Sequence, residues 1–445
     1  MHLTEKALAR LIQGDLPREE RNEAVRHLLT RCPECVRLAQ AVAARRFRRA
    51  RPGKAGVGIY DRIFKRLEGA HLPLMERFFK ERLLAAGQWA SLEKHPQAQR
   101  LALLAADPSF HTWGLYERLL EAAREAAPAH PGKGLERAHL ALAVANELDP
   151  QVYGEAPIMD FKAGALAVRG NCKRIAEDFE GARADLEHAS QLLEEGTGDP
   201  LATANLLSLR GSLSKDLGFY AESERLLQRA IHIYGKLRDE ENVGKVMVQQ
   251  ATAVGFLEPE RAVEILDTAT DYVNSIAHPL LELCLRHQLA VFLNDAGRTQ
   301  EAIGVLEDSR SLYDQFPDSV YQLRLRWLEG RISRNLGNLE EAEETFERLA
   351  EDFLGKGLSQ EYLLCRLDLA EAVYAQGDRA RTVEICTNLY RALESWHMHS
   401  EGLAVMLLFV SAVEEERVEQ GAFVDLARYL RQAWYVPQGK AVGVH

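Results

Sequence analysis

The fold is decided by residues 334–346, which read RNLGNLEEAEETF. The first residues of this stretch end one helix, and Gly337 stands where the chain turns. Glycine suits a helix C-terminus because the left-handed backbone conformation needed there is cheap only without a side chain. Five residues later comes the small Ala342, followed one helical turn on by the apolar Phe346 on the same face. The stretch therefore predicts two helices joined by a short turn and packed closely together.

The same pattern recurs along the chain from about residue 155 onward. Its turn positions lie 39 to 41 residues apart, at Glu177, Gly218, Leu257, Gly297, Gly337, Gly377 and Arg417. The small residues that follow are Ala182, Ser223, Ala262, Ala302, Ala342, Thr382 and Ala422, and the apolar ones are Leu186, Leu227, Leu266, Leu306, Phe346, Cys386 and Leu426. Such a period indicates a repeat architecture, in which stacked helix pairs bury a continuous core that one pair cannot form alone. The sequence thus predicts an all-α solenoid.

These copies resemble tetratricopeptide repeats (TPRs) in three respects. They share the helix-turn-helix form, the glycine at the turn, and the spacing of the small residue and the apolar residue that follow it. They are about six residues longer than the common unit. Longer units of this kind are familiar in TPR-like domains of bacterial transcription regulators and peptide sensors. The resemblance implies a right-handed superhelical solenoid over residues 155–436, with a concave wall and a C-terminal tail at 437–445. It implies no single function, because repeat folds serve many binding tasks.

Residues 57–154 are also helical by pattern, but their register is weaker. We expect helices over 58–68, 72–87, 89–106, 112–127 and 133–148. The run LALLAA at 101–106 has the apolar density of a buried helix, and the proline that follows shortly after breaks it. We interpret this region as an entry domain or as degenerate repeats that cap the solenoid.

Composition and charge limit the classes of partner. Of the 445 residues, 47% are hydrophobic and 27% are charged, which is typical of a globular protein. The net charge of −11 argues against a general nucleic-acid binder, because phosphate contacts require clustered Lys and Arg. The stretch RRFRRAR at 45–51 is a local exception. We interpret residues 45–56 as a basic flexible linker, with a contact for an acidic partner or a nucleic acid as the alternative.

The sequence also favours one compartment. The N-terminus opens without an apolar secretory segment, and no run of 18 apolar residues is present to span a membrane. Four cysteines are isolated within helical patterns and are interpreted as small buried hydrophobes, namely Cys172, Cys284, Cys365 and Cys386. We therefore expect a reducing, cytoplasmic setting with no membrane association.

The first 44 residues form a separate module by their histidine and cysteine spacing. His27 precedes the pair Cys32 and Cys35, and His2 lies 25 positions before His27. Two imidazoles and two thiolates can complete a tetrahedral zinc site, and so small a module gains stability from a metal. Together with the helix-turn-helix start LARLIQGDLPREE at 8–20, these residues resemble the zinc-binding anti-sigma fold.

That resemblance implies one zinc ion held by His2, His27, Cys32 and Cys35, and a sigma factor or related regulator as partner. This chain departs from the family pattern, because four residues instead of three separate His27 from Cys32. One extra helical residue rotates a ligand by about 100°. A degenerate finger that keeps the helices without metal is therefore the alternative, and a redox switch of the two thiols is a third, weaker one.

No motif for covalent chemistry is present in the sequence. The stretch GKAGVG at 53–58 lacks both the preceding strand and the Lys-Ser/Thr ending of a phosphate loop. No nucleophile elbow and no zinc-protease helix occurs. We therefore predict a binding protein and not an enzyme, with zinc as the single candidate cofactor.

A ligand is expected on the first helices of the repeats, which line the concave surface in TPR-like stacks. Polar residues on these helices, within apolar surroundings, are Arg210, Gln249, Arg286, Asn294, Arg326, Arg331 and Asp368. Arginine and asparagine there can hold the backbone or carboxylate of an extended peptide. Ordinary solvation of a helix face is the alternative for each. We expect Trp327 to pack in the core.

Three functions are consistent with this sequence. The first is a cytoplasmic bacterial scaffold or sensor that grips a protein or peptide in its groove. The second is a transcription-related regulator that binds a sigma factor through its N-terminal module. The third is a self-assembling solenoid, a homo-oligomer joined through its open ends, because the last helix around 424–430 is still amphipathic.

Overall fold

The computed structural model describes residues 3–13, 20, 34–35, 38, 77–274, 278–317, 320–396, 398, 400–419 and 421–433. The predicted zinc ligands His2, His27 and Cys32, the linker at 45–56 and the tail at 437–445 lie outside these residues. The chain divides into two compact units, Met1–Pro73 and Leu74–His445. In the first, helix α1 covers Glu5–Gln13 and begins where the Thr4 hydroxyl accepts the backbone N–H of Ala7 at 3.2 Å.

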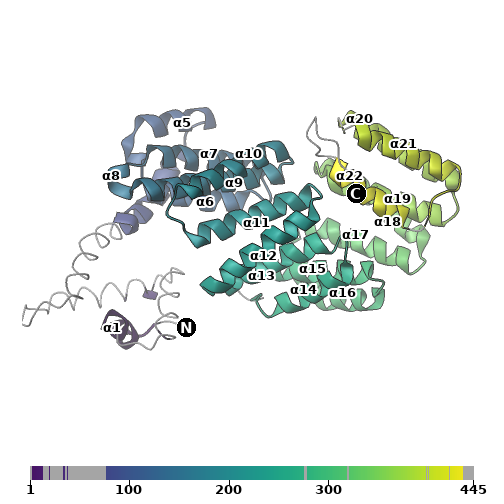
Figure 1. The fold of residues 1–445 in the computed structure, drawn as a ribbon, viewed down its shortest axis with the longest axis horizontal. Coiled ribbons are helices and arrows are strands. Elements are labelled where there is room, and N and C mark those ends of the chain that lie inside the picture. Colours follow the sequence, from purple (N-terminus) through teal and green to yellow (C-terminus); the bar gives the residue numbers. More distant parts are fainter. Residues whose placement is uncertain are drawn as a thin grey trace, which may run out of the picture. The chain divides into compact units, whose positions relative to one another are not determined.

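The second unit consists of helices in consecutive pairs (Figure 1). It opens with a helix over residues 77–93. Then follow α5 (Gln97–Ala106), the short 3₁₀-helix η1 (Pro108–Phe110), α6 (Trp113–Ala126), α7 (Pro131–Glu147), α8 (Pro150–Tyr153), α9 (Glu155–Ile175), α10 (Phe179–Glu194), α11 (Pro200–Asp216), α12 (Tyr220–Leu237), α13 (Glu240–Val254), α14 (Pro259–Thr270), α15 (Pro279–Asp295), α16 (Thr299–Asp314), α17 (Val320–Asn335), α18 (Leu339–Gly355), α19 (Ser359–Ala375), α20 (Arg379–Ser395), α21 (Ser400–Glu414) and α22 (Ala422–Ala433). The prediction of an all-α fold built from TPR-like helix pairs is confirmed.

The entry region differs from the expected helices at one boundary. The helix over 77–93 runs straight through Gly87, where a break was expected, and the chain breaks at Pro96 instead. A glycine inside a helix costs about 1 kcal/mol and is tolerated, whereas proline lacks the N–H that a helix interior requires. Both ends of helices α6 and α7 lie within one or two residues of the predicted spans.

The turns confirm the predicted role of glycine. Gly218, Gly297, Gly337 and Gly377 all adopt positive φ, between 77° and 85°. The first repeat instead carries a non-glycine residue there, Glu177, with φ of 61°.

Close packing within each pair depends on a residue type that the repeat pattern had not included. Seven residues before the turn, the first helix carries a glycine or alanine in most pairs, and this residue faces the apolar residue of the second helix. A Cβ atom added at Gly330 would lie 2.8 Å from Cε1 of Phe346, and one added at Gly211 would lie 2.7 Å from Cγ of Leu227. The predicted small residue Ala342 is fully buried at the same crossing. The backbone of the first helix therefore lies almost in contact with the apolar side chain of the second helix.

Successive pairs stack with a defined curvature. First helices pack on the first helices of neighbouring pairs, as α9 does on α11, α13 on α15 and α17 on α19. Among the described elements, second helices such as α16 and α18 do not pack closely on each other. The first helices therefore occupy the shorter, inner arc of the stack, and the second helices occupy the outer arc. We call the side formed by α9, α11, α13, α15, α17 and α19 the inner face.

Within the part of the chain that the structure describes, none of the helices combines the length and the apolar character needed to cross a membrane.

We predict that replacing Gly330 with valine lowers the free energy of unfolding by about 2 kcal/mol, because the new methyl groups overlap the ring of Phe346. The matched control is Gly304→Ala in the middle of α16, where an added Cβ meets no atom within 4 Å. That change should stabilise the chain, by up to about 1 kcal/mol. Urea unfolding of the full chain measures both. Equal effects of the two variants would contradict this account of the helix crossing.

Candidate functional site on the inner face

Polar side chains link neighbouring first helices along the inner face. The contacts are Arg174 to Asp216, Ser208 Oγ to Gln249 Oε1 at 2.7 Å, Cys284 Sγ to Tyr321 Oη at 2.7 Å, and Arg324 Nη2 to Glu361 Oε1 at 2.7 Å. The two partners in each are 37 to 42 residues apart in sequence. This separation is one repeat, so each contact joins a first helix to the next one.

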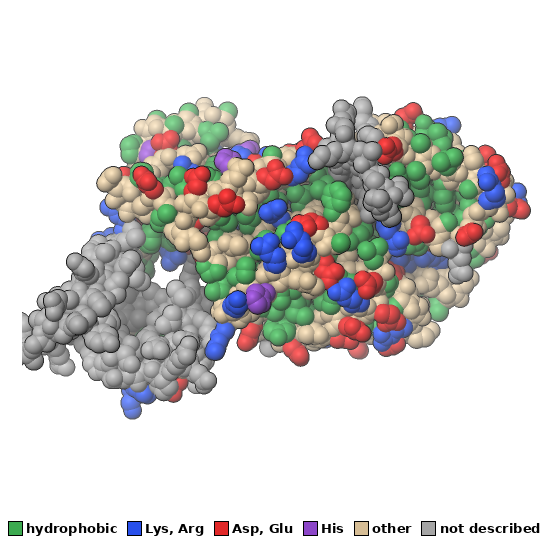
Figure 2. Space-filling model, viewed as in Figure 1, with side chains coloured by type: hydrophobic (Ala, Val, Ile, Leu, Met, Phe, Trp, Pro, Cys, Tyr) green, Lys and Arg blue, Asp and Glu red, His purple; other side chains and the backbone are tan. Residues whose placement is uncertain are grey.

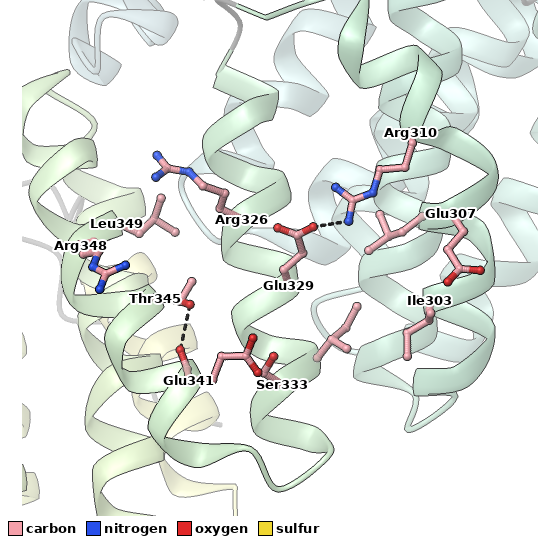
Figure 3. Close-up of a pocket in the computed structure, with 12 residues that line it drawn as sticks. Ile303, Glu307, Arg310, Arg326, Glu329, Ser333, Glu341, Thr345, Arg348 and Leu349 are labelled. Carbon is pink, nitrogen blue, oxygen red and sulfur yellow. Dashed lines mark hydrogen bonds and ion pairs between the residues drawn. The ribbon is translucent and has the colours of Figure 1, made fainter.

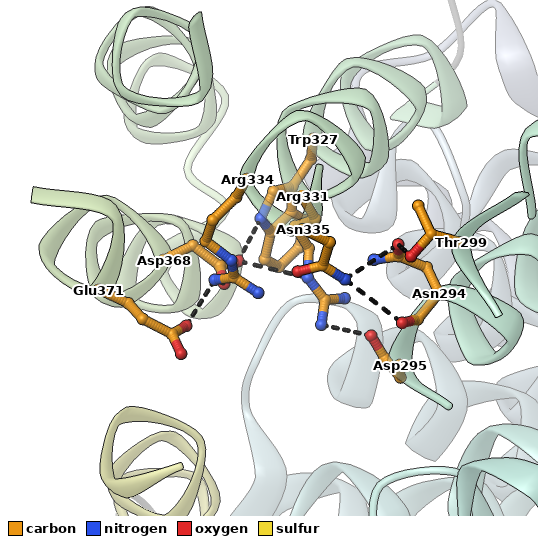
Figure 4. A network of polar contacts seen from close by, with 9 residues as sticks. All are labelled: Asn294, Asp295, Thr299, Trp327, Arg331, Arg334, Asn335, Asp368 and Glu371. Atoms are coloured by element: carbon orange, nitrogen blue, oxygen red, sulfur yellow. Dashed lines mark hydrogen bonds and ion pairs between the residues drawn. The ribbon is translucent and has the colours of Figure 1, made fainter. Parts of the chain in front are cut away.

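The densest part of this ladder lies on α15, α17 and α19 (Figure 4). Arg331 donates from Nη2 to Oδ1 of Asp295 at 2.6 Å. Arg334 donates from Nη1 to Oδ1 of Asp368 at 2.6 Å and to Oε2 of Glu371 at 2.5 Å. Two guanidinium groups thus face three carboxylates, so the group carries one more negative than positive charge when all are ionised. We call these five residues, together with Asn294, Thr299, Trp327 and Asn335, the inner-face network.

Trp327 has a dual role that the sequence did not reveal. Its ring packs edge-on against Phe353 with centroids 5.6 Å apart, as expected for a core residue. Its indole Nε1–H donates to Oδ2 of Asp368 at 2.7 Å. The tryptophan therefore anchors a carboxylate of the network to the hydrophobic core.

Two buried donors of the network lack an acceptor. Asn294 is 1% exposed, and its Oδ1 accepts from Nδ2 of Asn335 at 3.0 Å and from Thr299 Oγ1 at 3.1 Å. Its own Nδ2 has no hydrogen-bond partner among the described residues, and neither has Nε of Arg331, which lies 3.7 Å from Asp368. An unsatisfied buried donor costs about 1–3 kcal/mol. The network therefore contains two buried N–H groups without an acceptor among the described residues.

The negative charges of the network carboxylates are only partly compensated by the two guanidinium groups. Burial raises the pKa of Asp295 above its ordinary value, and the charge of Arg331 only partly opposes this shift. Burial likewise raises the pKa of Glu371 against the opposing charge of Arg334. The pKa of Arg331 is raised, because the carboxylates of Asp295 and Asp368 outweigh the desolvation that acts against its charge. A further positive charge placed here would be stabilised.

The residues predicted for ligand binding are divided between different places. Asn294, Arg331 and Asp368 come together in the inner-face network, and Gln249 on α13 belongs to the same ladder one pair before the network begins. Arg210 is half-buried on α11. Arg286 pairs within α15 with Glu282 at 2.8 Å.

Arg326 is turned away from the inner face. It pairs with Asp352 of α18 at 2.6 Å and lines a groove of about 540 Å³ between α16, α17 and α18 (Figure 3). The groove exists because the second helices diverge on the outer arc. Two other arginines of its lining are paired as well, since Arg310 donates to Glu329 at 2.5 Å and Arg348 to Glu344 at 3.1 Å.

Asp295, Arg334 and Glu371 were missed by the sequence reading. One feature of the sequence could have indicated them, because all three lie within six residues of a turn position, at the C-terminal end of a first helix. That criterion alone selects many solvated residues, so the pairing could be recognised only once the helices were placed side by side.

The titratable groups in the core do not have the properties of nucleophiles. Burial raises the pKa of the Cys172 thiol to about 11 and that of Cys386 to about 12. Burial also lowers the pKa of His287 to about 3, and its Nδ1 is hydrogen-bonded to the hydroxyl of Tyr313 at 2.8 Å.

Within the described ranges, no three His, Cys, Asp or Glu side chains are grouped to hold a metal ion. On the visible face, charges of both signs are interspersed (Figure 2).

One of the four predicted zinc ligands can be placed. Cys35 is buried, at 1% exposure, and its Sγ accepts the backbone N–H of Leu3 at 3.1 Å. The N-terminal residues therefore lie beside this sulfur, although 32 positions separate the two residues. Backbone N–H groups directed at a sulfur stabilise a thiolate, which is the form that binds zinc.

Comparisons with known proteins add little to these observations. No protein-family model matches the chain, and no curated protein matches it. Among solved structures, a crystal structure of a Rap protein complexed with competence and sporulation factor is similar, with 13% sequence identity and a TM-score of 0.45. The match covers 72% of this chain and 99% of that chain. At this identity and score, the function of this chain has to be argued from its own residues.

We predict that Arg331→Met lowers the free energy of unfolding at pH 8 by about 1–3 kcal/mol, because it leaves Asp295 half-buried and unpaired. The loss should shrink at pH 5. Removing Arg331 raises the pKa of Asp295 further, and protonation below that pKa removes the uncompensated charge.

The control is Arg326→Met on the same helix, whose exposed pair with Asp352 should contribute less than about 0.5 kcal/mol at either pH. Urea unfolding at pH 5 and pH 8 measures both variants. A loss for Arg331→Met that is the same at both pH values would refute the electrostatic account.

Proposed function

We propose that this chain is a non-enzymatic binding protein that holds an extended peptide, or an extended segment of a protein, on its inner face. The observation that carries the proposal is the inner-face network, where two buried N–H donors lack acceptors beside three carboxylates and two guanidinium groups. A peptide backbone alternates carbonyl acceptors with amide donors, which matches a face that offers both.

The charge of the network indicates the kind of peptide. Asn294 Nδ2 and Arg331 Nε can donate to main-chain carbonyl oxygens. The surplus carboxylate charge, with the raised pKa values of Asp295 and Glu371, favours a ligand that brings a cation. We therefore expect a peptide with a lysine or arginine side chain, or with its N-terminal ammonium group, at this point.

The test is a binding screen of the full chain against a library of fluorescein-labelled 12-residue peptides. The tightest binders should be enriched in Lys and Arg. Replacing Arg331 with lysine keeps the charge but removes Nε and the planar fork, and should weaken the best peptide at least about tenfold.

Arg326→Lys is the matched control, because Arg326 lies on the same helix and also pairs with one aspartate at 2.6 Å, but lines the outer groove. Its affinity should stay within about twofold of the parent. Equal losses in the two variants, or no peptide bound above background, would rule out this site. Fluorescence anisotropy gives the dissociation constants.

We also propose that the first unit holds one zinc ion through His2, His27, Cys32 and Cys35. The hydrogen bond from Leu3 to the buried Cys35 sulfur supports this, since it brings the N-terminus to a predicted ligand.

We expect about one zinc per purified chain by elemental analysis, and a loss of most of it in Cys35→Ser. Cys284→Ser is the control, because this half-buried thiol lies on α15 and its hydrogen bond to Tyr321 can be kept by a hydroxyl. Zinc-free parent protein purified from zinc-supplemented cells would exclude the metal.

A further inference from the structure

Helix α21 is apolar on two sides, and one of them faces the core. Residues 402–413 of this helix read GLAVMLLFVSAV and contain no charged side chain. Gly402, Met406 and Val413 are buried, and Met406 belongs to the core cluster that also contains residues of α19 and α20. A helix at a protein surface normally presents charged and polar side chains on its opposite side. The side of α21 that faces away from the core is instead apolar as well.

This outward side consists of one line of residues. Ala404, Leu407, Leu408 and Ser411 are all exposed, and their spacing of three and four positions places them along one face of the helix. Leu408 is 70% exposed and Leu407 is 49% exposed. Single exposed leucines are ordinary at a protein surface, whereas aligned leucines on an uncharged helix mark an interaction site. We call these four residues the α21 stripe.

The α21 stripe has no cover from the described helices. Among these, only α20 and α22 pack closely on α21 (Figure 1). The contact with α22 includes Phe409 and Phe423, whose ring centroids are 4.9 Å apart. First helices in earlier pairs are flanked on both sides by other first helices, as α17 is by α15 and α19. The stripe is therefore a helix-packing surface that lacks the helix it would pack against.

The stripe is symmetric in residue size about its midpoint. Read in either direction, it presents a small, a large, a large and a small side chain. An antiparallel second copy, related by a two-fold axis between Leu407 and Leu408, places each Leu407 against Leu408 of the other copy. Ala404 then meets Ser411, and these small residues let the two backbones approach while the leucines fill the middle. The stripe is thus complementary to itself, as a two-fold contact requires.

Charge favours this partner over a contact between opposite ends of two stacks. The helix over residues 77–93 also exposes leucines, with Leu83 at 68% and Leu84 at 61%. Lys80 and Arg82 are exposed beside them. Packing that helix on α21 would remove cations from water against a stripe that has no carboxylate to pair with them. Packing α21 on α21 buries no charged side chain of the stripe.

The size of the contact fits a reversible dimer. α21 has 15 residues and is therefore about 22 Å long. Two helices that pack along this length, with their flanking side chains, bury on the order of 1,000 Å² in total, which is near the lower limit for a specific interface. Such an interface corresponds to a dissociation constant in the micromolar range.

We propose that the α21 stripe is the contact surface of a homodimer, in which the α21 helices of two copies pack antiparallel about a two-fold axis. The nearest charges in line with the stripe are Glu401 and Glu414, at its two ends. In this register each faces the other residue in the second copy. Salt screens this repulsion, so the dimer should tighten as the NaCl concentration rises. The proposal does not rest on the proposed peptide binding.

The experiment is sedimentation equilibrium of the full chain from about 1 to about 200 µM, a range that brackets the affinity expected for this interface. The mass should rise with concentration from 50.0 kDa toward twice that value. Leu408→Glu should weaken the dimer at least about tenfold, because it places a carboxylate in an apolar contact. Since Leu408 is exposed in the single chain, this variant should fold normally, and thermal unfolding checks that it does.

Leu280→Glu is the matched control. Leu280 lies in the first turn of α15 and is 45% exposed, close to the exposure of Leu407. The dissociation constant of this variant should stay within about twofold of the parent.

A mixture of Leu407→Glu and Leu408→Lys tests the two-fold axis. In the mixed dimer one contact pairs the introduced carboxylate with the introduced ammonium group, and the other contact keeps two leucines. Each variant paired with itself buries two like charges. The mixed dimer should therefore be at least about tenfold tighter than either variant alone. Sedimentation velocity of trace fluorescein-labelled Leu407→Glu, titrated with unlabelled Leu408→Lys, measures this.

A parent chain that stays at 50.0 kDa over the whole range would overturn the dimer. Equal effects of Leu408→Glu and Leu280→Glu would exclude the α21 stripe as its contact surface. Species that grow beyond two copies, or no gain in affinity on mixing, would exclude the two-fold arrangement. Since no readout uses a peptide, these results stand apart from those that test the proposed function.

Discussion

The structure depends on the close contact between the two helices of each pair. Gly330 against Phe346 and Gly211 against Leu227 leave no room for even one additional methyl group on the first helix. This fit fixes the crossing of the two helices, because any larger residue would push them apart. Ala370 occupies the position equivalent to Gly330 in the next repeat, where the smaller Cys386 replaces Phe346, and both residues are buried in one core cluster. A repeated crossing then repeats the same small rotation from pair to pair.

That rotation creates the two sides of the molecule. On the inner arc the first helices are near enough for side chains one repeat apart to meet, as Arg331 meets Asp295 and Arg324 meets Glu361. On the outer arc the second helices diverge, and the groove beside Arg326 opens between them. Polar residues on the inner arc are thus brought together by the curvature, whereas the same residue types on the outer arc form pairs at an exposed surface. The inner face is for this reason a place where charges from neighbouring repeats are brought together and partly desolvated.

The inner-face network is anchored to the core, but two of its buried hydrogen-bond donors lack an acceptor among the described residues. Trp327 donates to Asp368 and packs in the core, so the carboxylate is held in position. The orphan donors on Asn294 and Arg331 and the raised pKa of Asp295 indicate a local cost that the rest of the fold compensates. Sites of this kind hold free energy that a ligand or a proton can release.

The sequence by itself determined the helices, their turns and the pairing within each repeat. These follow from interactions over a few residues: Gly337 ends a helix because of its own backbone freedom, and Ala342 and Phe346 share a face because a helix turns every 3.6 residues. Only the tertiary structure decided which polar residues meet. Arg334 and Glu371 lie on different helices, and Arg428 contacts the backbone oxygen of Phe256 across 172 residues of sequence, so these contacts depend on how the intervening pairs stack. A local pattern cannot encode such contacts, because each one depends on the placement of every helix pair that lies between the two residues.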